Sequence, residues 1–276
     1  VAVDGNSAWV QVMQAPGGPA AEPGISVYTG GPVTSQGTAL TVHFNEGSLS
    51  FNPAYAGDLA GSGQLRLGGQ SFGLTQIGSA ISGSLSSPDG LFPVDVTMPF
   101  FTAEPWAGVL LFDGLDMGRI WQEGLEQRAS GPAEPRNIWS FEEDVTVLAL
   151  SQEVISALKT TYVYTGGAHP NSFRASHNPV SDGNGGWTEV ARLCDAAAAL
   201  GWACDETRVR ELVIADLTEQ GAEWVRSGEL TAEQLWLLEV FVLGTDGVTV
   251  VFDPYAAGPY VQGPFFVDLS YASLAD

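Results

Sequence analysis

The stretch Tyr162–Asn171 has the sequence YVYTGGAHPN, in which alternating aromatic and β-branched residues run into two glycines, a histidine and a proline. Such alternation is typical of a strand, which we expect to extend from Val154 to Tyr164. Glycine tolerates positive φ angles, so Gly166-Gly167 lets the chain reverse or lets another backbone approach closely. The stretch therefore predicts a long strand that ends in an exposed, tightly turning loop.

Strand patterns continue on both sides of this stretch. Residues 145–150 are apolar and β-branched, and Ser151-Gln152-Glu153 separates them from the strand at 154–164. Near the C-terminus, a polar turn at Thr245-Asp246-Gly247 lies between two apolar runs and predicts a hairpin. The remaining expected strands are residues 94–98, 238–243, 248–252 and 265–269, and residues 254–263 are expected to form a loop.

Apolar residues at helical spacing mark the other segments. Residues 111–127 place Leu115, Ile120, Trp121 and Leu125 on or near one face. Residues 178–186 are expected to form a polar loop, and a second helix is expected to begin at Thr188. Further helices follow an N-cap at Asp205 and a capping box at residues 231–234. The order of strands, helices and strands predicts an α+β fold, an antiparallel sheet with helices packed on one face, preceded by a small all-β N-terminal unit.

Residues 1–90 are rich in Gly, Ser and Thr and poor in charge. Short alternating runs predict a β-rich unit with one wet face. Residues 16–23 are expected to form a loop, and Asn45-Glu46-Gly47 a hairpin loop. Ser86–Gly90 is the strongest boundary signal, so we expect domains at 1–90 and 91–276. The alternating runs are residues 9–12, 40–44, 48–51, 64–67 and 71–74.

Acidic residues dominate the charge of this chain. Ten basic residues stand against 32 acidic ones, the net charge is −22, and Lys159 is the only lysine. A surface of this sign repels phosphate backbones and anionic membranes, which disfavours nucleic-acid binding. A basic protein, a cationic ligand or a neutral sugar is still compatible with this surface. The alternative is that the acidic composition reflects only the solubility of the protein and its source organism. Glu142-Glu143-Asp144 is expected to be a solvated turn before a strand.

The apolar runs, the start of the chain and the two cysteines bear on the cell compartment in which the protein resides. No run approaches the ~20 apolar residues of a membrane span. The chain begins at Val1, so we expect that any leader or lipid-anchor cysteine upstream has already been removed. Cys194 and Cys204 are the two cysteines, and their close spacing fits a disulfide in an oxidising compartment. Two buried thiols in a helical region are the alternative.

Three elements share the order and spacing of one known family over residues from about 92 to 274. They are Val96-Thr97-Met98-Pro99 followed by a helix, the YTGGAH element at Tyr164–His169, and the region Phe241–Val267. The last contains Asp246-Gly247, Phe252, Pro254-Tyr255, Pro259-Tyr260 and Gly263. Together they resemble the extracellular domain shared by the anti-sigma factor RsiV and the N-terminal part of the deacetylase PdaC.

The resemblance implies an envelope-exposed α+β module, secreted or lipid-anchored, in the periplasm or at the cell surface. In RsiV-like proteins this module binds lysozyme, and in PdaC-like proteins the deacetylase chemistry lies in a separate domain. The expected function is therefore a non-catalytic binding module for lysozyme or another basic protein, or for cell-wall glycan. Exposed loops often carry binding residues, and the candidates here are Tyr164, Thr165, Gly166, Gly167, His169, Asn171 and His177. The structural alternative is that the two glycines only allow the turn and that His169 anchors the loop by hydrogen bonds to the backbone.

The histidines, serines and acidic residues of the sequence do not form a recognisable catalytic or metal-binding motif. His169, His177 and Asp182 are too scattered in the sequence to predict a zinc site. Asp182–Gly186 begins like a calcium loop but has Leu193 at its twelfth position, so a turn is favoured. No GxSxG motif occurs, and no cofactor or metal is expected. Two alternatives stay open: a hydrolase of envelope polymers that uses His169 as acid or base, and a structural lipoprotein.

Overall fold

The computed structural model describes residues 2–4, 7–12, 27–36, 39–44, 47–52, 62–67, 70–75, 78–101, 105–107, 109, 117–130, 138–235, 240–244 and 246–275. Contacts divide the chain into two compact units, Val1–Ile81 with Pro99–Leu111, and Ser82–Met98 with Phe112–Asp276. Sheets and helices both occur, which confirms the predicted α+β class. Among the residues described, no helix combines the length and the apolar character that crossing a membrane requires.

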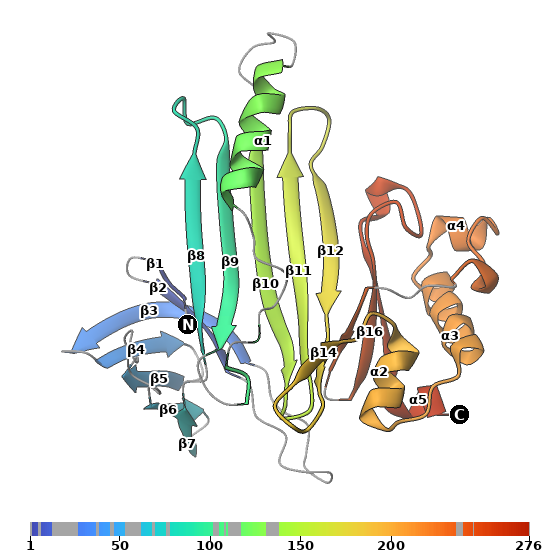
Figure 1. Cartoon of the computed structure of the whole chain (residues 1–276), viewed down its shortest axis with the longest axis horizontal. Helices are drawn as coiled ribbons and strands as arrows, with labels where there is room; N and C mark the ends of the chain where they lie inside the picture. Colours follow the sequence, from blue (N-terminus) through green and yellow to red (C-terminus); the bar gives the residue numbers. More distant parts are fainter. Residues whose placement is uncertain are drawn as a thin grey trace. The chain divides into compact units, whose positions relative to one another are not determined.

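The first unit contains a seven-stranded sheet in which the strands follow one another in chain order (Figure 1). All of its neighbouring pairs are antiparallel. The five alternating runs predicted here are confirmed as strands. Phe44 lies opposite Gly47, while Asn45, Glu46 and the loop predicted at 16–23 fall outside the described residues. The strands are β1 (Ala2–Asp4), β2 (Ser7–Val12), β3 (Val27–Gln36), β4 (Ala39–Phe44), β5 (Gly47–Asn52), β6 (Ser62–Leu67) and β7 (Gln70–Thr75).

A five-stranded sheet has the order β12-β11-β10-β9-β8. The strand pair predicted at 145–164 is confirmed, since β10 and β11 pair antiparallel from Ser140 opposite Tyr164 to Leu150 opposite Ile155. In contrast to the antiparallel pairing expected throughout, β9 and β10 are parallel. Parallel neighbours need a crossover, and α1 (Met117–Ser130) lies within it. The strands are β8 (Gly78–Ser86), β9 (Pro93–Phe101), β10 (Ser140–Leu150), β11 (Ile155–Tyr164) and β12 (Asn171–His177).

Helix α1 packs against β9 and β10 (Figure 1). Its residues Ile120, Trp121 and Leu125 contact a buried cluster that includes Phe92, as the helical spacing predicts; Leu115 lies outside the described residues. A β-carbon at Gly124 would clash with Cε1 and Cζ of the Phe92 ring, so this glycine permits the close approach. The other members of the cluster are Val94, Val96, Met98, Trp139 and Phe141.

The end of α1 is tied to the turn between β8 and β9. This turn contains Ser87–Gly90, where the sequence predicts a domain boundary, and Gly90 N–H donates to Ser87 O at 2.8 Å. Arg128 Nη2 lies 2.9 Å from Asp89 Oδ2. Hydrogen bonds from Arg128 and then Ser87 hold the pKa of the Asp89 carboxyl well below its usual range.

A three-stranded sheet, β15-β16-β17, carries the main core together with α2 and α3. The predicted hairpin and final strand are confirmed as β15 (Phe241–Leu243), β16 (Gly247–Phe252) and β17 (Phe265–Ser270). The predicted N-cap is also confirmed, because the Asp205 side chain accepts from the N–H groups of Thr207 and Arg208. The helices are α2 (Leu193–Leu200), α3 (Glu206–Glu219), α4 (Glu223–Arg226), α5 (Tyr271–Ala275) and the short 3-10 helices η1 (Ala232–Gln234) and η2 (Tyr260–Gln262).

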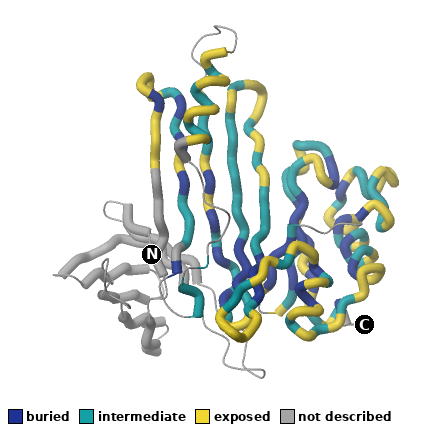
Figure 2. Tube along the Cα trace, viewed as in Figure 1, coloured by how far each residue is buried: buried dark blue, intermediate teal, exposed yellow. Residues whose placement is uncertain are grey.

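Buried polar side chains join β15 to the five-stranded sheet. Leu243 N–H donates to Ser156 Oγ at 2.8 Å, and Ser156 Oγ donates to Asn178 Oδ1 at 2.6 Å. Asn178 Nδ2 donates to Phe241 O at 3.0 Å, and Phe241 N–H donates to Ser176 Oγ at 3.2 Å. The edge of β15 is therefore satisfied by side chains instead of by another strand. Figure 2 shows buried residues gathered in the three-stranded sheet and in the ends of β10 and β11 next to it.

Two local predictions for residues 178–193 are wrong. The expected polar loop contains a short hairpin of β13 (Pro179–Ser181) and β14 (Trp187–Glu189), and Asn178 is fully buried. The helix expected from Thr188 begins instead at Leu193, because Thr188 lies in β14 opposite Val180. The polarity and spacing of the local sequence do not reveal the pairing of β13 with β14.

The expected solvated turn at Glu142-Glu143-Asp144 is also wrong, because all three residues lie within β10. Glu143 is only 6% exposed. Its Oε2 accepts from Thr161 Oγ1 at 2.8 Å and lies 3.5 Å from Lys159 Nζ. The only lysine of the chain thus pairs with a buried carboxylate on the neighbouring strand. The register of β10 and β11 brings the two together, so the local sequence around Glu143 does not reveal the pair.

Candidate functional site

The predicted site residues other than His177 lie in or next to the loop between β11 and β12. Tyr164 ends β11, Asn171 begins β12, and Thr165 is exposed between them. Gly166 and Gly167 have φ angles of 85° and 119°, in the region that favours glycine. A β-carbon on Gly167 would meet nothing within 4 Å, so backbone conformation and not space requires glycine there. Tyr164 OH donates to Gly167 O at 3.2 Å and supports the loop.

His169 meets two tyrosines from the loop that follows β16. Its ring stacks on Tyr260 with a centroid distance of 3.8 Å and an interplanar angle of 18°. The Tyr255 ring lies 6.5 Å from His169 and 5.6 Å from Tyr260. We call His169, Tyr255 and Tyr260 the ring cluster. It joins the loop between β11 and β12 to two tyrosines that follow His169 by 86 and 91 positions in the chain.

The carbonyl oxygen of Pro170 holds the ring cluster together. It accepts from Tyr260 OH at 2.7 Å and lies 2.9 Å from His169 Nδ1. A carbonyl oxygen can only accept, so Nδ1 carries the proton of the imidazole in this arrangement. In the neutral ring, Nε2 is then an acceptor, and its neighbour is Tyr255 OH at 3.5 Å.

Tyr255 has an unusual backbone conformation. Its φ is 71°, and it is the one non-glycine residue of the described part with a positive φ. A bulky side chain in this region costs on the order of 1–3 kcal/mol, which the surrounding structure must offset. The side chain is nevertheless 52% exposed. The fold therefore keeps Tyr255 in a strained backbone conformation although its ring is open to solvent. Strained backbone conformations are frequent at functional sites.

An ion pair fixes the Tyr255 loop to β12. Asp253 accepts from Arg174 N–H at 2.9 Å through Oδ2 and from Arg174 Nη1 at 3.0 Å through Oδ1. The Arg174 guanidinium also lies 5.5 Å from the centre of the Phe266 ring. These contacts tie the start of the loop that carries Tyr255 to β12. Exposed apolar side chains nearby in sequence are Phe173, Val261 and Phe266.

The other predicted residues lie apart from the ring cluster. His177 ends β12, whereas His169 precedes its start, and His177 Nδ1 lies 3.0 Å from Glu189 Oε2. Asp182 forms the turn expected for Asp182–Gly186: Oδ1 accepts from the N–H groups of Asn184 and Gly186. Within the described residues, no group of three or more His, Cys, Asp and Glu side chains is arranged to hold a metal ion.

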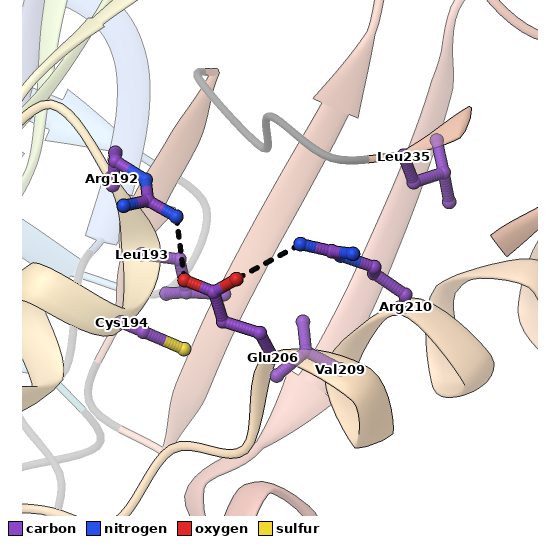
Figure 3. A pocket seen from close by; sticks show the side chains of 7 residues that line it. All are labelled: Arg192, Leu193, Cys194, Glu206, Val209, Arg210 and Leu235. Atoms are coloured by element: carbon purple, nitrogen blue, oxygen red, sulfur yellow. Dashed lines mark hydrogen bonds and ion pairs between the residues drawn. The ribbon is translucent and has the colours of Figure 1, made fainter. Parts of the chain in front are cut away.

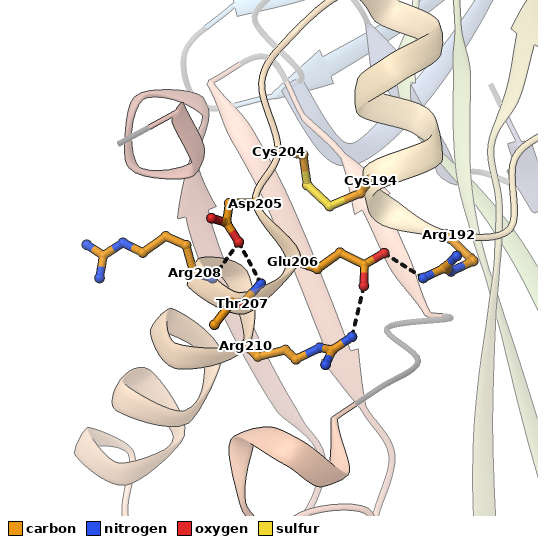
Figure 4. Close-up of a disulfide and its surroundings, with 8 residues drawn as sticks. All are labelled: Arg192, Cys194, Cys204, Asp205, Glu206, Thr207, Arg208 and Arg210. Atoms are coloured by element: carbon orange, nitrogen blue, oxygen red, sulfur yellow. Dashed lines mark hydrogen bonds and ion pairs between the residues drawn. A yellow bond between two sulfur atoms is a disulfide. The ribbon is translucent and has the colours of Figure 1, made fainter.

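The two cysteines form a disulfide, as the first interpretation predicts. Cys194 in α2 bonds to Cys204, with their Cα atoms 5.4 Å apart (Figure 4). A pocket beside it has an apolar side of Leu193, Val209 and Leu235. The two arginines that line the pocket, Arg192 and Arg210, both point to Glu206, with Nη2–Oε distances of 2.6 and 2.9 Å (Figure 3). Both arginines are thus paired within the junction of α2 and α3, and the pocket is a feature of that junction.

Comparison with protein families finds one match, which covers part of the chain. The family model described as "Protein of unknown function (DUF3298)" matches residues 205–272. The match includes Tyr255 and Tyr260, whereas His169 lies outside it. The link to RsiV and PdaC stays a prediction. No curated protein matches the chain.

Solved structures of DUF3298 proteins are similar to this chain at low sequence identity. A member of that family from Bacteroides fragilis is 13% identical, with a TM-score of 0.41, over 71% of this chain and 89% of its own. A DUF3298 family protein from Pseudomonas aeruginosa is 16% identical, with a TM-score of 0.41, over 71% of this chain and 90% of its own.

The sequence predicts His169 as a candidate binding residue but does not single out Tyr255 or Tyr260, whose rings lie beside it. Tyr255 and Tyr260 stood in the sequence only as parts of the Pro-Tyr pairs that mark the family resemblance. Two Pro-Tyr pairs within one Gly-containing loop were the available signal, since proline limits the backbone that presents each ring. Nothing in the linear sequence indicated that this loop meets the loop at Thr165–Pro170.

Proposed function

We propose that this chain is a non-catalytic binding module of the bacterial cell envelope, located in the periplasm or at the cell surface as a secreted or lipid-anchored protein. Its ligand is a basic protein such as lysozyme, or cell-wall glycan. The resemblance to the RsiV and PdaC extracellular domain supports the compartment and the class of function. The ring cluster supplies the binding surface.

The observation that carries this proposal is the exposed ring of Tyr255 on a strained backbone, braced by His169 and Tyr260. Aromatic rings contribute large contact areas with little loss of side-chain freedom, and tyrosine is enriched among residues that dominate binding energy. The net charge of −22 attracts basic partners and does not repel neutral glycans.

Two binding assays test the proposal with the whole chain. Lysozyme binding is measured by biolayer interferometry at low and moderate salt, and glycan binding by co-sedimentation with insoluble peptidoglycan. Tyr255→Ala removes the exposed ring. Val261→Ala is the matched control, because Val261 is 89% exposed and adjacent to Tyr260 in the chain but has no ring.

We expect the wild-type chain to bind at least one of the two ligands. Tyr255→Ala should weaken that binding by about tenfold or more, whereas Val261→Ala should change it by less than about twofold. Absence of binding to both ligands at both salt concentrations would refute the proposal. Release of soluble peptidoglycan fragments by the wild type, lost in His169→Ala, would favour the hydrolase instead.

A further inference from the structure

The members of the ring cluster have different exposures, and this difference defines its outer surface. Tyr260 is half-buried, stacks on the imidazole and uses its hydroxyl on Pro170 O, so it acts as a support. Tyr255 and His169 are exposed. A ligand would therefore meet the ring of Tyr255 and the outer edge of His169.

The outer edge of His169 presents a hydrogen-bond acceptor. Because Nδ1–H donates a hydrogen bond to Pro170 O, the free lone pair of the neutral imidazole is on Nε2. The 3.5 Å separation between Nε2 and Tyr255 OH is long for an O–H···N hydrogen bond. A ligand hydroxyl that approached at a normal distance would make the better bond. The fixed orientation of the imidazole means that the ligand need not order it first.

The charge beside the cluster is already compensated. Asp253, the carboxylate closest to Tyr255 in the chain, binds Arg174 through both of its oxygens. A cationic ligand would have to compete with this arginine, which also packs over Phe266. An aromatic face next to an exposed acceptor and a phenol hydroxyl suits instead an uncharged ligand that has a C–H face and hydroxyl groups.

We propose that the ring cluster binds a neutral sugar ring, with the C–H face of the sugar against Tyr255 and a sugar hydroxyl donating to His169 Nε2. This inference rests on the proposed function and assigns the class of ligand for that site. A single stacked ring and one neutral hydrogen bond give weak affinity per sugar, so repeated sugars in a glycan chain would strengthen binding.

Four variants of the whole chain separate the two contacts. Tyr255→Ala removes the ring, and Tyr255→Phe keeps the ring without its hydroxyl. His169→Phe keeps a ring stacked on Tyr260 but removes the Nε2 acceptor. Val261→Ala is the control. The probes are the neutral tetrasaccharides chitotetraose, cellotetraose and maltotetraose, with tetramethylammonium as a cationic probe and lysozyme as the protein probe.

Titrations followed by NMR chemical shifts give the dissociation constants. We expect at least one tetrasaccharide to shift the signals of Tyr255 and the His169 imidazole. Tyr255→Ala should weaken this binding by about tenfold and His169→Phe by about fivefold. Val261→Ala should stay within about twofold of wild type. Tyr255→Phe, which keeps the ring but loses the phenol hydroxyl, should weaken binding by less than Tyr255→Ala does. A long-range ¹H–¹⁵N spectrum should show the Nδ1–H form of His169 in the free protein.

The outcomes distinguish this inference from the proposed function. Lysozyme binding that needs Tyr255, without binding of any tetrasaccharide, would overturn the sugar site and leave the binding module standing. Tetramethylammonium binding in place of tetrasaccharide binding would also overturn it. Tetrasaccharide binding that is equal in wild type and His169→Phe would reject the assigned role of Nε2. Absence of binding to sugar, lysozyme and peptidoglycan would refute both proposals.

Discussion

Asn178→Ala tests whether buried polar contacts hold β15 against the five-stranded sheet. Asn178 is 0% exposed, and its side chain accepts from Ser156 Oγ and donates to Phe241 O. Truncation leaves the Ser156 hydroxyl proton and the Phe241 carbonyl without these partners. Each buried polar group left without a partner costs about 1–3 kcal/mol, so for the two groups the expected loss is about 2–6 kcal/mol in the free energy that keeps β15 in place.

Native-state hydrogen exchange measures this loss where it arises. The Leu243 amide donates to Ser156 Oγ, so its protection reports opening of β15 without assuming that both units unfold together. The opening free energy at Leu243 should fall by about the same 2–6 kcal/mol in Asn178→Ala. The control Asn184→Ala removes an exposed amide whose Nδ2 donates to Asp182 O at 3.3 Å, and should change stability by less than about 0.5 kcal/mol.

A change below about 0.5 kcal/mol in Asn178→Ala would refute the reasoning, because it would mean that water or neighbouring groups replace both hydrogen bonds freely. An equal loss in Asn184→Ala would also refute it. That result would show a general effect of truncating asparagine in this region.

Three further predictions concern packing, charge and pH. Gly124→Ala should lower the free energy of unfolding by about 1–3 kcal/mol despite the better helix propensity of alanine, because the new Cβ meets the Phe92 ring; a raised melting temperature would contradict this. Lys159→Met should lower the free energy of unfolding in urea titrations, because it leaves the buried Glu143 carboxylate without its cation. Adding Glu143→Gln should recover part of this loss, because the double variant has no buried charge; no recovery would contradict this. Burial raises the pKa of Tyr271 to about 12, from 10.0. Its neutral hydroxyl therefore contributes stability in full below pH 10 and loses that contribution as the pH rises through about 12. Tyr271→Phe should lack this alkaline loss in urea titrations, and an equal loss in both proteins would exclude Tyr271 as its source.

The elements with strong local patterns could be predicted from the sequence. Alternation located β10 and β11, and the short linker at Ser151–Glu153 required them to be antiparallel neighbours. Asp205 was identifiable as an N-cap because its side chain can reach the free N–H groups of the next turn. The glycines at 166 and 167 have the positive φ angles expected for this loop.

Features that depend on partners distant in sequence could not be predicted. Glu143 looks solvated in a run of three acids, and only the register of β10 and β11 brings it to Thr161 and Lys159. The parallel pairing of β9 with β10 depends on the α1 crossover, which the strand patterns do not encode. The ring cluster likewise combines His169 with rings from another loop, and Tyr255 is strained only in that context.

The central claim is that the ring cluster is the binding surface of this chain. Hydrogen–deuterium exchange of the whole chain, alone and with saturating lysozyme or soluble peptidoglycan fragments, tests it most directly. We predict that the ligand slows exchange in residues 165–171 and 253–262 of the wild type, and that this protection disappears in Tyr255→Ala. Protection confined to other segments, or protection of these two loops that persists in Tyr255→Ala, would contradict the account.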